Sequence, residues 1–165
     1  MRRSLPDNPE KVVINTGPLI ALNLAEALDV IGRLPFEFHS PPAIERELRV
    51  GVSKGYPLIM PAWLKITDLK QPVNPIAALM LDEGEAEVIQ LACEFDRCSV
   101  CIDERKGRRL AVAVGLKVTG ALGLLLTAKR LGLIPCLKPF FDRLSESKIW
   151  YDPALVHRIL AEAGE

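Results

Sequence analysis

Polar side chains that suit a divalent cation occur at separated places in this chain. Asn15 follows the apolar run KVVI, and Asp103 follows the apolar run CSVCI. A short continuous apolar run is typical of a strand buried inside a parallel sheet. Because ligand sites of open α/β sheets lie beyond the carboxyl ends of the strands, we expect Asn15 and Asp103 at one edge of the sheet.

Two glutamates are expected to reach the same edge from predicted helices. In the helix predicted for residues 82–95, Glu85 lies in the first turn, on the side of the apolar stripe. In the helix predicted for residues 41–50, Glu47 shares the inward side. Burying an unpaired carboxylate is costly, and a shared cation would remove that cost. The hard oxygen donors of these two glutamates, of the asparagine and of the aspartate suit Mg²⁺ or Mn²⁺.

Each of these residues also has an ordinary structural interpretation. Asp82 and Glu85 match a capping box, and the helix dipole favours acids in a first turn. Glu47 can pair with an arginine on a neighbouring turn or farther away. Asp103 can cap the helix that follows it, and Asn15 can hydrogen-bond its own turn. The expected convergence of four oxygen-bearing side chains favours a cation site over four separate explanations.

Strand and helix signals alternate along the rest of the chain. Strands are predicted at 11–14, 36–39, 63–69, 98–102 and 116–118, and helices at 19–28, 41–50, 72–80, 82–95, 104–114, 120–131, 140–144 and 153–163. Thr16 is the candidate N-cap of the first helix, and residues 51–61 are predicted to form a loop. The alternation predicts right-handed βαβ units, and therefore an α/β fold whose mainly parallel sheet is covered on both faces.

Length and composition narrow the class of protein. The 165 residues fit one domain, with residues 1–10 as a flexible arm and 11–165 as a single domain with a helical C-terminal tail. Equal numbers of basic and acidic residues, 21 each, exclude a general nucleic-acid coat protein but allow a local basic patch.

Four cysteines do not make a disulfide framework, and the polar N-terminus has no apolar signal core. We therefore expect a cytoplasmic protein. Lys117 and glycines interrupt the apolar stretch 110–128, which argues against a membrane span.

The chain resembles the PIN-domain superfamily in five stretches that follow one another in the expected order. They are VVINTGPLIAL (12–22), PPAIEREL (41–48), LDEGEAEVIQLA (81–92), CIDERKGRRLAVAVGLKVTGALGLLLTAKRLGLI (101–134) and KPFFDRL (138–144). It resembles in particular a PIN-like family of largely uncharacterised bacterial and archaeal proteins, related to the virulence-associated toxin C ribonucleases. Each piece is weak alone, but the ordered set covers most of the chain and is specific.

The resemblance implies a three-layer α/β/α sandwich with a central, mainly parallel sheet and a metal-dependent endoribonuclease site. It assigns catalysis to Asn15, Glu47, Glu85 and Asp103, and places Mg²⁺ or Mn²⁺ on the last three of these. Asn15 stands where active PIN nucleases typically have Asp. The site therefore carries three carboxylates, which lowers the expected metal affinity and the activation of an attacking water.

The resemblance also implies partners. It points to an RNA substrate, a small antitoxin protein and a second copy of the chain, with no membrane. On this reading the protein is a metal-dependent ribonuclease, the toxin half of a toxin–antitoxin pair. Asn15 favours the alternative, a catalytically weak or inactive PIN-like domain that acts by binding RNA or protein.

Contacts to RNA are expected next to the acidic residues. The backbone amides of Thr16 and Gly17, at a helix N-terminus, are candidates to hold a phosphate. The basic residues directly after Asp103 are the best candidates for RNA contact: Arg105, Lys106, Arg108 and Arg109. A solvated helix face that pairs with nearby acids explains this run equally well. Large aromatic side chains are interpreted as core or interface residues rather than base-stacking platforms: Trp63, Phe140, Phe141 and Trp150.

Overall fold

A computed structural model describes residues 9–165 of the chain. Residues 1–8, which make up most of the predicted N-terminal arm, lie outside the described residues. The first strand begins at Glu10, so the last residue assigned to the arm already belongs to the sheet.

Five parallel strands form the central sheet. They are β1 (Glu10–Ile14), β2 (Phe36–Ser40), β3 (Leu64–Ile66), β4 (Cys98–Cys101) and β5 (Lys117–Thr119). Their order across the sheet is β3-β2-β1-β4-β5, and each neighbouring pair is parallel. The chain therefore builds outward from β1 first on one side and then on the other. The order reverses between β1 and β4, which is the place where open α/β sheets bind ligands.

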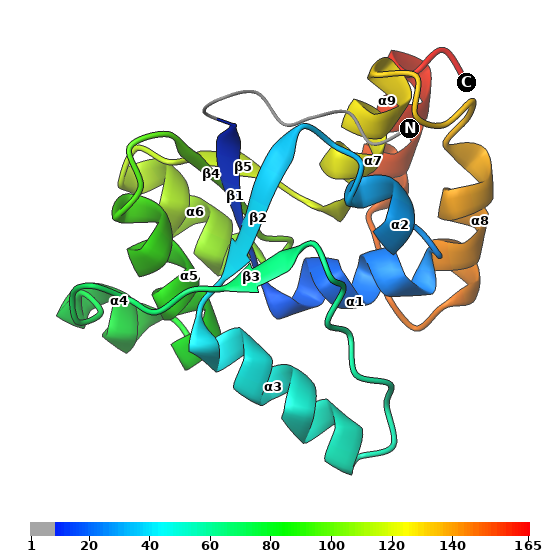
Figure 1. Cartoon of the computed structure of the whole chain (residues 1–165). Helices are drawn as coiled ribbons and strands as arrows, with labels where there is room; N and C mark the ends of the chain where they lie inside the picture. Colours follow the sequence, from blue (N-terminus) through cyan, green and yellow to red (C-terminus); the bar gives the residue numbers. More distant parts are fainter. Residues whose placement is uncertain (1–8) are drawn as a thin grey trace.

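Helices cover both faces of the sheet and make the fold a three-layer α/β/α sandwich, as predicted. In chain order they are α1 (Thr16–Leu24), α2 (Leu28–Ile31), α3 (Pro42–Ser53), α4 (Pro75–Met80), α5 (Glu83–Cys93), α6 (Arg105–Ala113), α7 (Ala121–Arg130), α8 (Lys138–Glu146) and α9 (Pro153–Glu162). Figure 1 shows α5 and α6 on one side of the sheet and α1, α2, α7 and α8 on the other. Helix α9 packs on the outside of α7, and α3 contacts both α1 and α5.

The central strand is buried on both faces, as its apolar run predicts. Val12, Val13 and Ile14 have at most 1% of their surface exposed. Since side chains alternate between the two faces of a strand, this burial requires helices on both sides. The core thus fixes the direction of β1, and with it the place where Asn15 leaves the sheet.

The first helix begins and ends earlier than predicted. It starts at Thr16 and ends at Leu24, and its N-cap position is held by Asn15 rather than Thr16. Its C-terminus is a Schellman motif, in which the Ala27 N–H donates to Leu22 O and Glu26 has φ of 56°. Glycine usually holds that left-handed position, so the sequence carries no obvious stop signal there. The short helix α2 follows and was not predicted separately.

Two further boundaries differ from the sequence prediction. Helix α3 continues to Ser53, through the start of the predicted loop at 51–61. The reason is that Gly51 is helical and the left-handed position belongs to Gly55, at φ 90°, after which Tyr56 N–H donates back to Gly51 O. Strand β3 is only three residues long, from Leu64 to Ile66, because the chain pairs with β2 only there.

The apolar stretch 110–128 contains the end of α6, strand β5 and most of α7, in agreement with its interruption by polar residues. Between residues 9 and 165, no helix has the length and apolar character needed to cross a membrane. The four cysteines are all free thiols.

Candidate functional site at the carboxyl edge of the sheet

Strands β1 and β4 end side by side and bring Asn15 and Asp103 to the same edge of the sheet. The backbone N–H of Asn15 donates to Cys101 O at 3.0 Å, directly after the paired part of β1. Asn15 is buried, with 6% of its surface exposed. It occupies the N-cap position of α1, yet its side chain makes no capping hydrogen bond. The amide is therefore not used as the cap for which asparagine is well suited.

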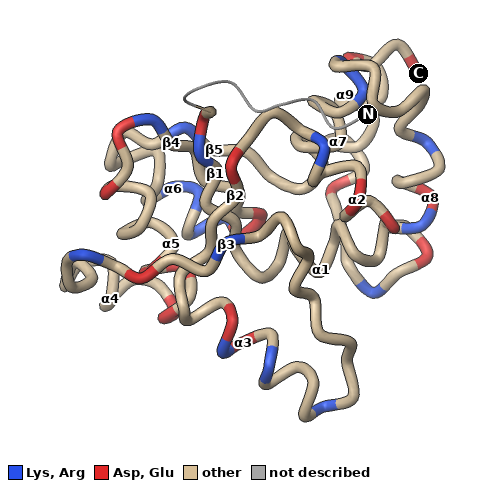
Figure 2. Tube along the Cα trace, in the orientation of Figure 1, with Lys and Arg blue, Asp and Glu red and all other residues tan. Residues whose placement is uncertain are grey.

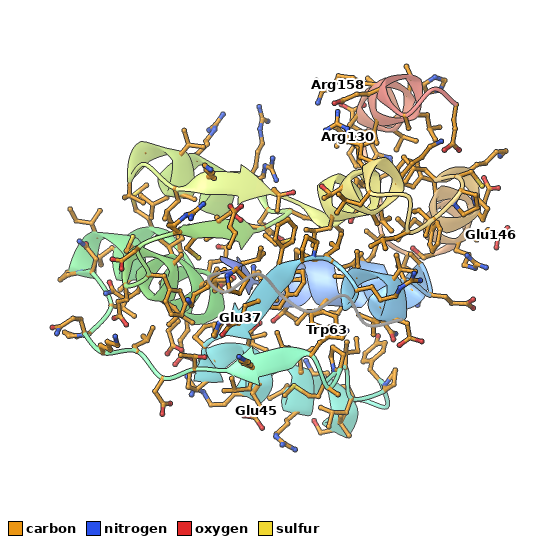
Figure 3. The ribbon with its side chains drawn as sticks, turned by 45° about the horizontal axis from the view of Figure 1, so that its top comes forward. Glu37, Glu45, Trp63, Arg130, Glu146 and Arg158 are labelled. Atoms are coloured by element: carbon orange, nitrogen blue, oxygen red, sulfur yellow. The ribbon has the colours of Figure 1, made fainter. Side chains whose placement is uncertain are left out.

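The next residue, Thr16, joins α1 to α3. Its hydroxyl donates a hydrogen bond to a carboxylate oxygen of Glu47. The arginines on either side of Glu47 in the sequence pair with other acids: Arg46 with Glu83 and Glu87, and Arg49 with Glu45. Figure 3 shows Glu45 on the outer side of α3. The salt-bridge explanation of Glu47 is thus not the one the structure adopts.

Glu47 is more exposed than its expected place on the apolar stripe implies. Its carboxylate nevertheless lies against the first turn of α5, where a Cβ on Gly84 would collide with Glu47 Oε1. Partial burial raises the pKa of Glu47, the Thr16 hydrogen bond opposes the shift, and the charges of Asp82 and Glu83 add to it. Glycine at position 84 therefore leaves the space that this carboxylate fills.

Glu85 is the most unusual acid in this region. Only 5% of its surface is exposed, and its Oε1 atom is buried without a hydrogen-bond partner. A Cβ on Gly107 would lie 2.8 Å from that oxygen, so the carboxylate lies between α5 and α6. Burial raises the pKa of Glu85 to about 6, and the negative charges of Asp82, Glu104 and Glu47 contribute.

Half of the predicted capping box is present. The Asp82 side chain accepts a hydrogen bond from the Glu85 backbone N–H at 2.8 Å and caps α5. The Glu85 carboxylate does not complete the box, because among the described residues it accepts no hydrogen bond from the Asp82 N–H, and its Oε1 has no partner at all. An orphaned buried carboxylate oxygen calls for an explanation other than capping.

Asp103 is held by two hydrogen bonds from distant parts of the chain. Its Oδ1 accepts from the Ala121 N–H at 3.0 Å, and its Oδ2 accepts from the Tyr151 hydroxyl at 2.9 Å. Burial raises the pKa of Asp103, while these two bonds and the positive charge of Arg108 oppose the shift. The alternative interpretation of Asp103, as the cap of the following helix, is not the one found: Glu104 holds the N-cap position of α6, and Asp103 binds the first turn of α7.

The structure brings the predicted residues to one edge but not into one closed cluster. Glu47 and Glu85 are close enough for the charge of one to raise the pKa of the other, whereas Asp103 is engaged by α7 and Tyr151. Within residues 9–165, no three His, Cys, Asp or Glu side chains are placed so that they could hold a metal ion together. The unpartnered oxygen of Glu85 and its raised pKa fit a cation. Each Asp103 oxygen accepts one hydrogen bond within the described residues, which leaves a second lone pair on each.

The basic residues of α6 divide into two groups. Arg108 points inward, and its Nη1 donates to Ile102 O at 2.7 Å and to Thr119 O at 3.0 Å. Through this nitrogen it holds the ends of β4 and β5 together, so its guanidinium is less available to RNA than those of its exposed neighbours. Arg105, Lys106 and Arg109 are exposed, and none of them takes part in an ion pair within the described residues.

The alternative interpretation, in which the basic residues of α6 pair with nearby acids, therefore does not hold for Arg105, Lys106 and Arg109. Figure 2 shows basic and acidic positions interspersed over the described chain, in keeping with the balanced composition. Any attraction for a polyanion must come from local groups such as the exposed face of α6, and not from a global basic field.

The aromatic residues also behave differently from one another. Trp63 packs against Phe38 with ring centroids 4.9 Å apart, and its indole N–H donates to Leu28 O. Phe141 is buried. Trp150, in contrast, is 77% exposed, which excludes a place in the core and leaves the interface half of the prediction untested. Its neighbour Tyr151, which binds Asp103, was missed because no spacing in the sequence links residues 48 positions apart.

Comparison with known proteins gives one match. The model of a family described as a PIN domain matches residues 11–165, nearly the whole chain. No curated protein and no solved structure matches this sequence. PIN domains have the fold of nucleases and generally use divalent metals. The parallel sheet, the polar edge at β1 and β4 and this match together show that the chain belongs to the PIN-domain family.

Proposed function

We propose that this PIN domain is a metal-dependent endoribonuclease. The observation that carries the proposal is the buried Glu85 carboxylate, which has an orphaned oxygen, a raised pKa and a second carboxylate, Glu47, close by. A pair of partly desolvated acids is unfavourable in the protein alone, and a divalent cation removes that repulsion. Asp103, at the end of β4, is the third acid of this edge; because α7 and Tyr151 hold its carboxylate apart from Glu47 and Glu85, it would have to move to share their cation.

Bound Mg²⁺ or Mn²⁺ would activate a water and offset the charge that develops on an RNA phosphodiester. The chain's own residues prepare the edge for it. Thr16 holds the Glu47 carboxylate toward α5. Gly84 and Gly107 leave room for Glu47 and Glu85, respectively, because any larger residue would push the carboxylate away. Asn15 contributes a buried amide, which is a neutral oxygen donor.

The substrate is held by groups around this edge. The first turn of α1 starts at Thr16, and Gly17 is exposed with open space around its α-carbon. Backbone N–H groups at a helix N-terminus bind phosphate. On α6, Arg105, Lys106 and Arg109 supply exposed positive charges for neighbouring phosphates.

Calorimetric titration of Mn²⁺ tests the metal site directly. We expect binding by the wild-type chain and at least a tenfold loss of affinity in Glu85→Gln, with RNA cleavage lost in the same variant. Glu146→Gln, on the exposed end of α8, is the matched control and should bind and cleave like the wild type. Absence of binding at millimolar Mn²⁺ would remove the basis of the proposal.

A second function is favoured by Asn15. Without a carboxylate at the end of β1, the domain has one acid fewer to activate water. Under this alternative the domain binds RNA or a protein and cleaves slowly or not at all. Metal binding without cleavage, in both the wild type and Asn15→Asp, is the outcome expected of it.

The proposed biological setting is a toxin–antitoxin pair in the cytoplasm, with a small antitoxin as partner and a homodimer as the assembled form. Induced expression of the chain alone should arrest growth, and Glu85→Gln should relieve the arrest. Cells that grow normally while they express the wild-type chain would argue against a toxin. The ribonuclease assay would still decide whether the chain cleaves RNA.

A further inference from the structure

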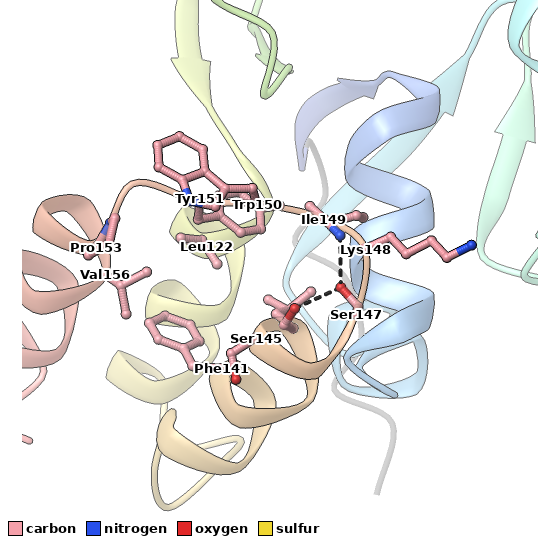
Figure 4. A pocket seen from close by; sticks show the side chains of 11 residues that line it. Leu122, Phe141, Ser145, Ser147, Lys148, Ile149, Trp150, Tyr151, Pro153 and Val156 are labelled. Atoms are coloured by element: carbon pink, nitrogen blue, oxygen red, sulfur yellow. Dashed lines mark hydrogen bonds between the residues drawn. The ribbon is translucent and has the colours of Figure 1, made fainter.

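A groove next to the candidate site has no role in the function proposed above. It has a volume of about 460 Å³ and lies between α7, α8, α9 and the connecting segment 147–152. Its lining residues are mostly apolar, and Lys148 brings the only charge among them. Figure 4 shows Trp150 and Tyr151 on the connecting segment, with Leu122, Phe141 and Val156 beneath them.

The connecting segment is fixed at both ends. At its start, the Ser147 hydroxyl donates to Leu144 O at 2.7 Å and accepts from the Ile149 N–H at 3.1 Å. At its end, Asp152 accepts from the Ala154 N–H and caps α9. A short segment with these anchors presents its side chains in a defined direction.

Tyr151 attaches this segment to the candidate site. Its hydroxyl donates to Asp103 Oδ2 at 2.9 Å, across 48 positions of sequence. The next side chain, Trp150, is directed to the solvent with 77% of its surface exposed. A large aromatic ring is therefore displayed one residue away from a proposed catalytic carboxylate, on a segment that is tied to that carboxylate.

The chemistry of this surface favours one class of ligand. A flat, exposed indole suits another flat ring, and a mostly apolar groove suits a ligand with apolar faces. Lys148, whose side chain extends away from Trp150 in Figure 4, suits an anion beside the groove rather than within it. A ligand that combines a flat ring with a phosphate, and that extends to a carboxylate edge, is a nucleotide within a strand. A protein partner would match the apolar groove but not the connection to Asp103.

We propose that segment 147–152 is a nucleobase-binding subsite in which Trp150 stacks on a base of single-stranded RNA. The inference rests on the proposed function for the identity of the substrate. It adds that recognition extends from the carboxylate edge to the C-terminal part of the chain, and that Tyr151 holds the two together.

The test measures RNA binding without cleavage. The full chain, kept metal-free with EDTA, is titrated into a fluorescently labelled single-stranded RNA of about 12 nucleotides, and anisotropy is followed. We expect Trp150→Ala to weaken binding by about tenfold, the order of loss typical of one stacked base. Trp150→Phe should retain most of the affinity. Tyr56→Ala removes another exposed aromatic, in the loop after α3, and should bind like the wild type.

The possible outcomes separate this inference from the proposed nuclease. Unchanged RNA binding in Trp150→Ala, or no RNA binding by the wild type, overturns the subsite. Unchanged RNA binding together with loss of self-association in sedimentation would assign the surface to contacts between copies of the chain. A Trp150-dependent affinity without cleavage in Mn²⁺ supports the subsite and refutes only the nuclease activity.

Discussion

Replacing Glu85 by glutamine should stabilise the metal-free protein at neutral pH. A carboxyl group whose pKa is about 6 in the folded chain, against an ordinary 4.5, disfavours folding once it is ionised. The difference corresponds to about 2 kcal/mol above pH 6, because one pKa unit is equivalent to about 1.4 kcal/mol. This is an upper value, since water that reaches the carboxylate softens the cost. Glutamine keeps the shape of the side chain and removes the ionisation.

The sign of the pH dependence follows from the same shift. Below pH 4.5 the group is protonated in both the folded and the unfolded chain, so it has no effect on their balance. As the pH rises from 4.5 to 6 and above, the unfolded chain releases the proton more readily, and the wild type loses stability that Glu85→Gln keeps. The two proteins should therefore differ least near pH 4.5 and most near pH 8.

Thermal denaturation in EDTA measures this difference. For a chain of this size about 2 kcal/mol corresponds to a Tm higher by about 4–8 °C at pH 8. The variant Glu146→Gln is the control and should show no pH-dependent gain. Added Mn²⁺ should raise the Tm of the wild type and have little effect on Glu85→Gln. An equal difference between wild type and Glu85→Gln at pH 5 and pH 8 would refute the reasoning, because the carboxylate would then not be desolvated by folding.

Three further changes test other parts of the edge. Asn15→Asp places a fourth acid at a buried position, so it should lower the Tm of the metal-free chain and raise the affinity for Mn²⁺ measured by calorimetry. An unchanged affinity would show that residue 15 does not contact the metal. Arg108→Met removes two hydrogen bonds to backbone carbonyls and should lower the free energy of unfolding in urea by about 2 kcal/mol. Arg109→Met should leave the free energy of unfolding unchanged and reduce the salt dependence of RNA binding. Gly84→Ala should displace the Glu47 carboxylate and weaken Mn²⁺ binding while the circular dichroism spectrum stays that of the wild type.

The fold was largely predictable because its signals are local. Apolar runs predicted β1 and β4, and the alternation of strand and helix signals along the chain predicted the parallel sheet. The predicted ends of helices α1 and α3 were wrong because the residue at the end of each helix is not the one that usually ends a helix. Glu26 occupies a left-handed position usually taken by glycine, and Gly51 lies inside a helix that ends only before Gly55. Local preference alone does not decide such cases, since tertiary packing determines which turn is used.

The candidate site was predictable only in part. The sequence predicts that Asn15, Glu85 and Asp103 lie at one edge, because the direction of a strand or helix determines where its end and its apolar face lie. The direction of a side chain within that edge depends on distant partners. The hydroxyl of Tyr151 fixes Asp103, and two carbonyls draw Arg108 inward, and no sequence spacing encodes either contact.

The sheet order has a consequence for how the chain is made. Lys11 of β1 pairs with Glu37 of β2 and also with Cys98 of β4. During synthesis from the N-terminus, β1 and β2 can pair early, but one edge of β1 stays open until β4 has emerged. The carboxylate edge needs β4 as well, and Tyr151 reaches Asp103 later still. A growing chain therefore holds no complete site, and a ribosome-bound fragment that stops before residue 98 should be inert toward RNA and prone to pair its open strand with other chains.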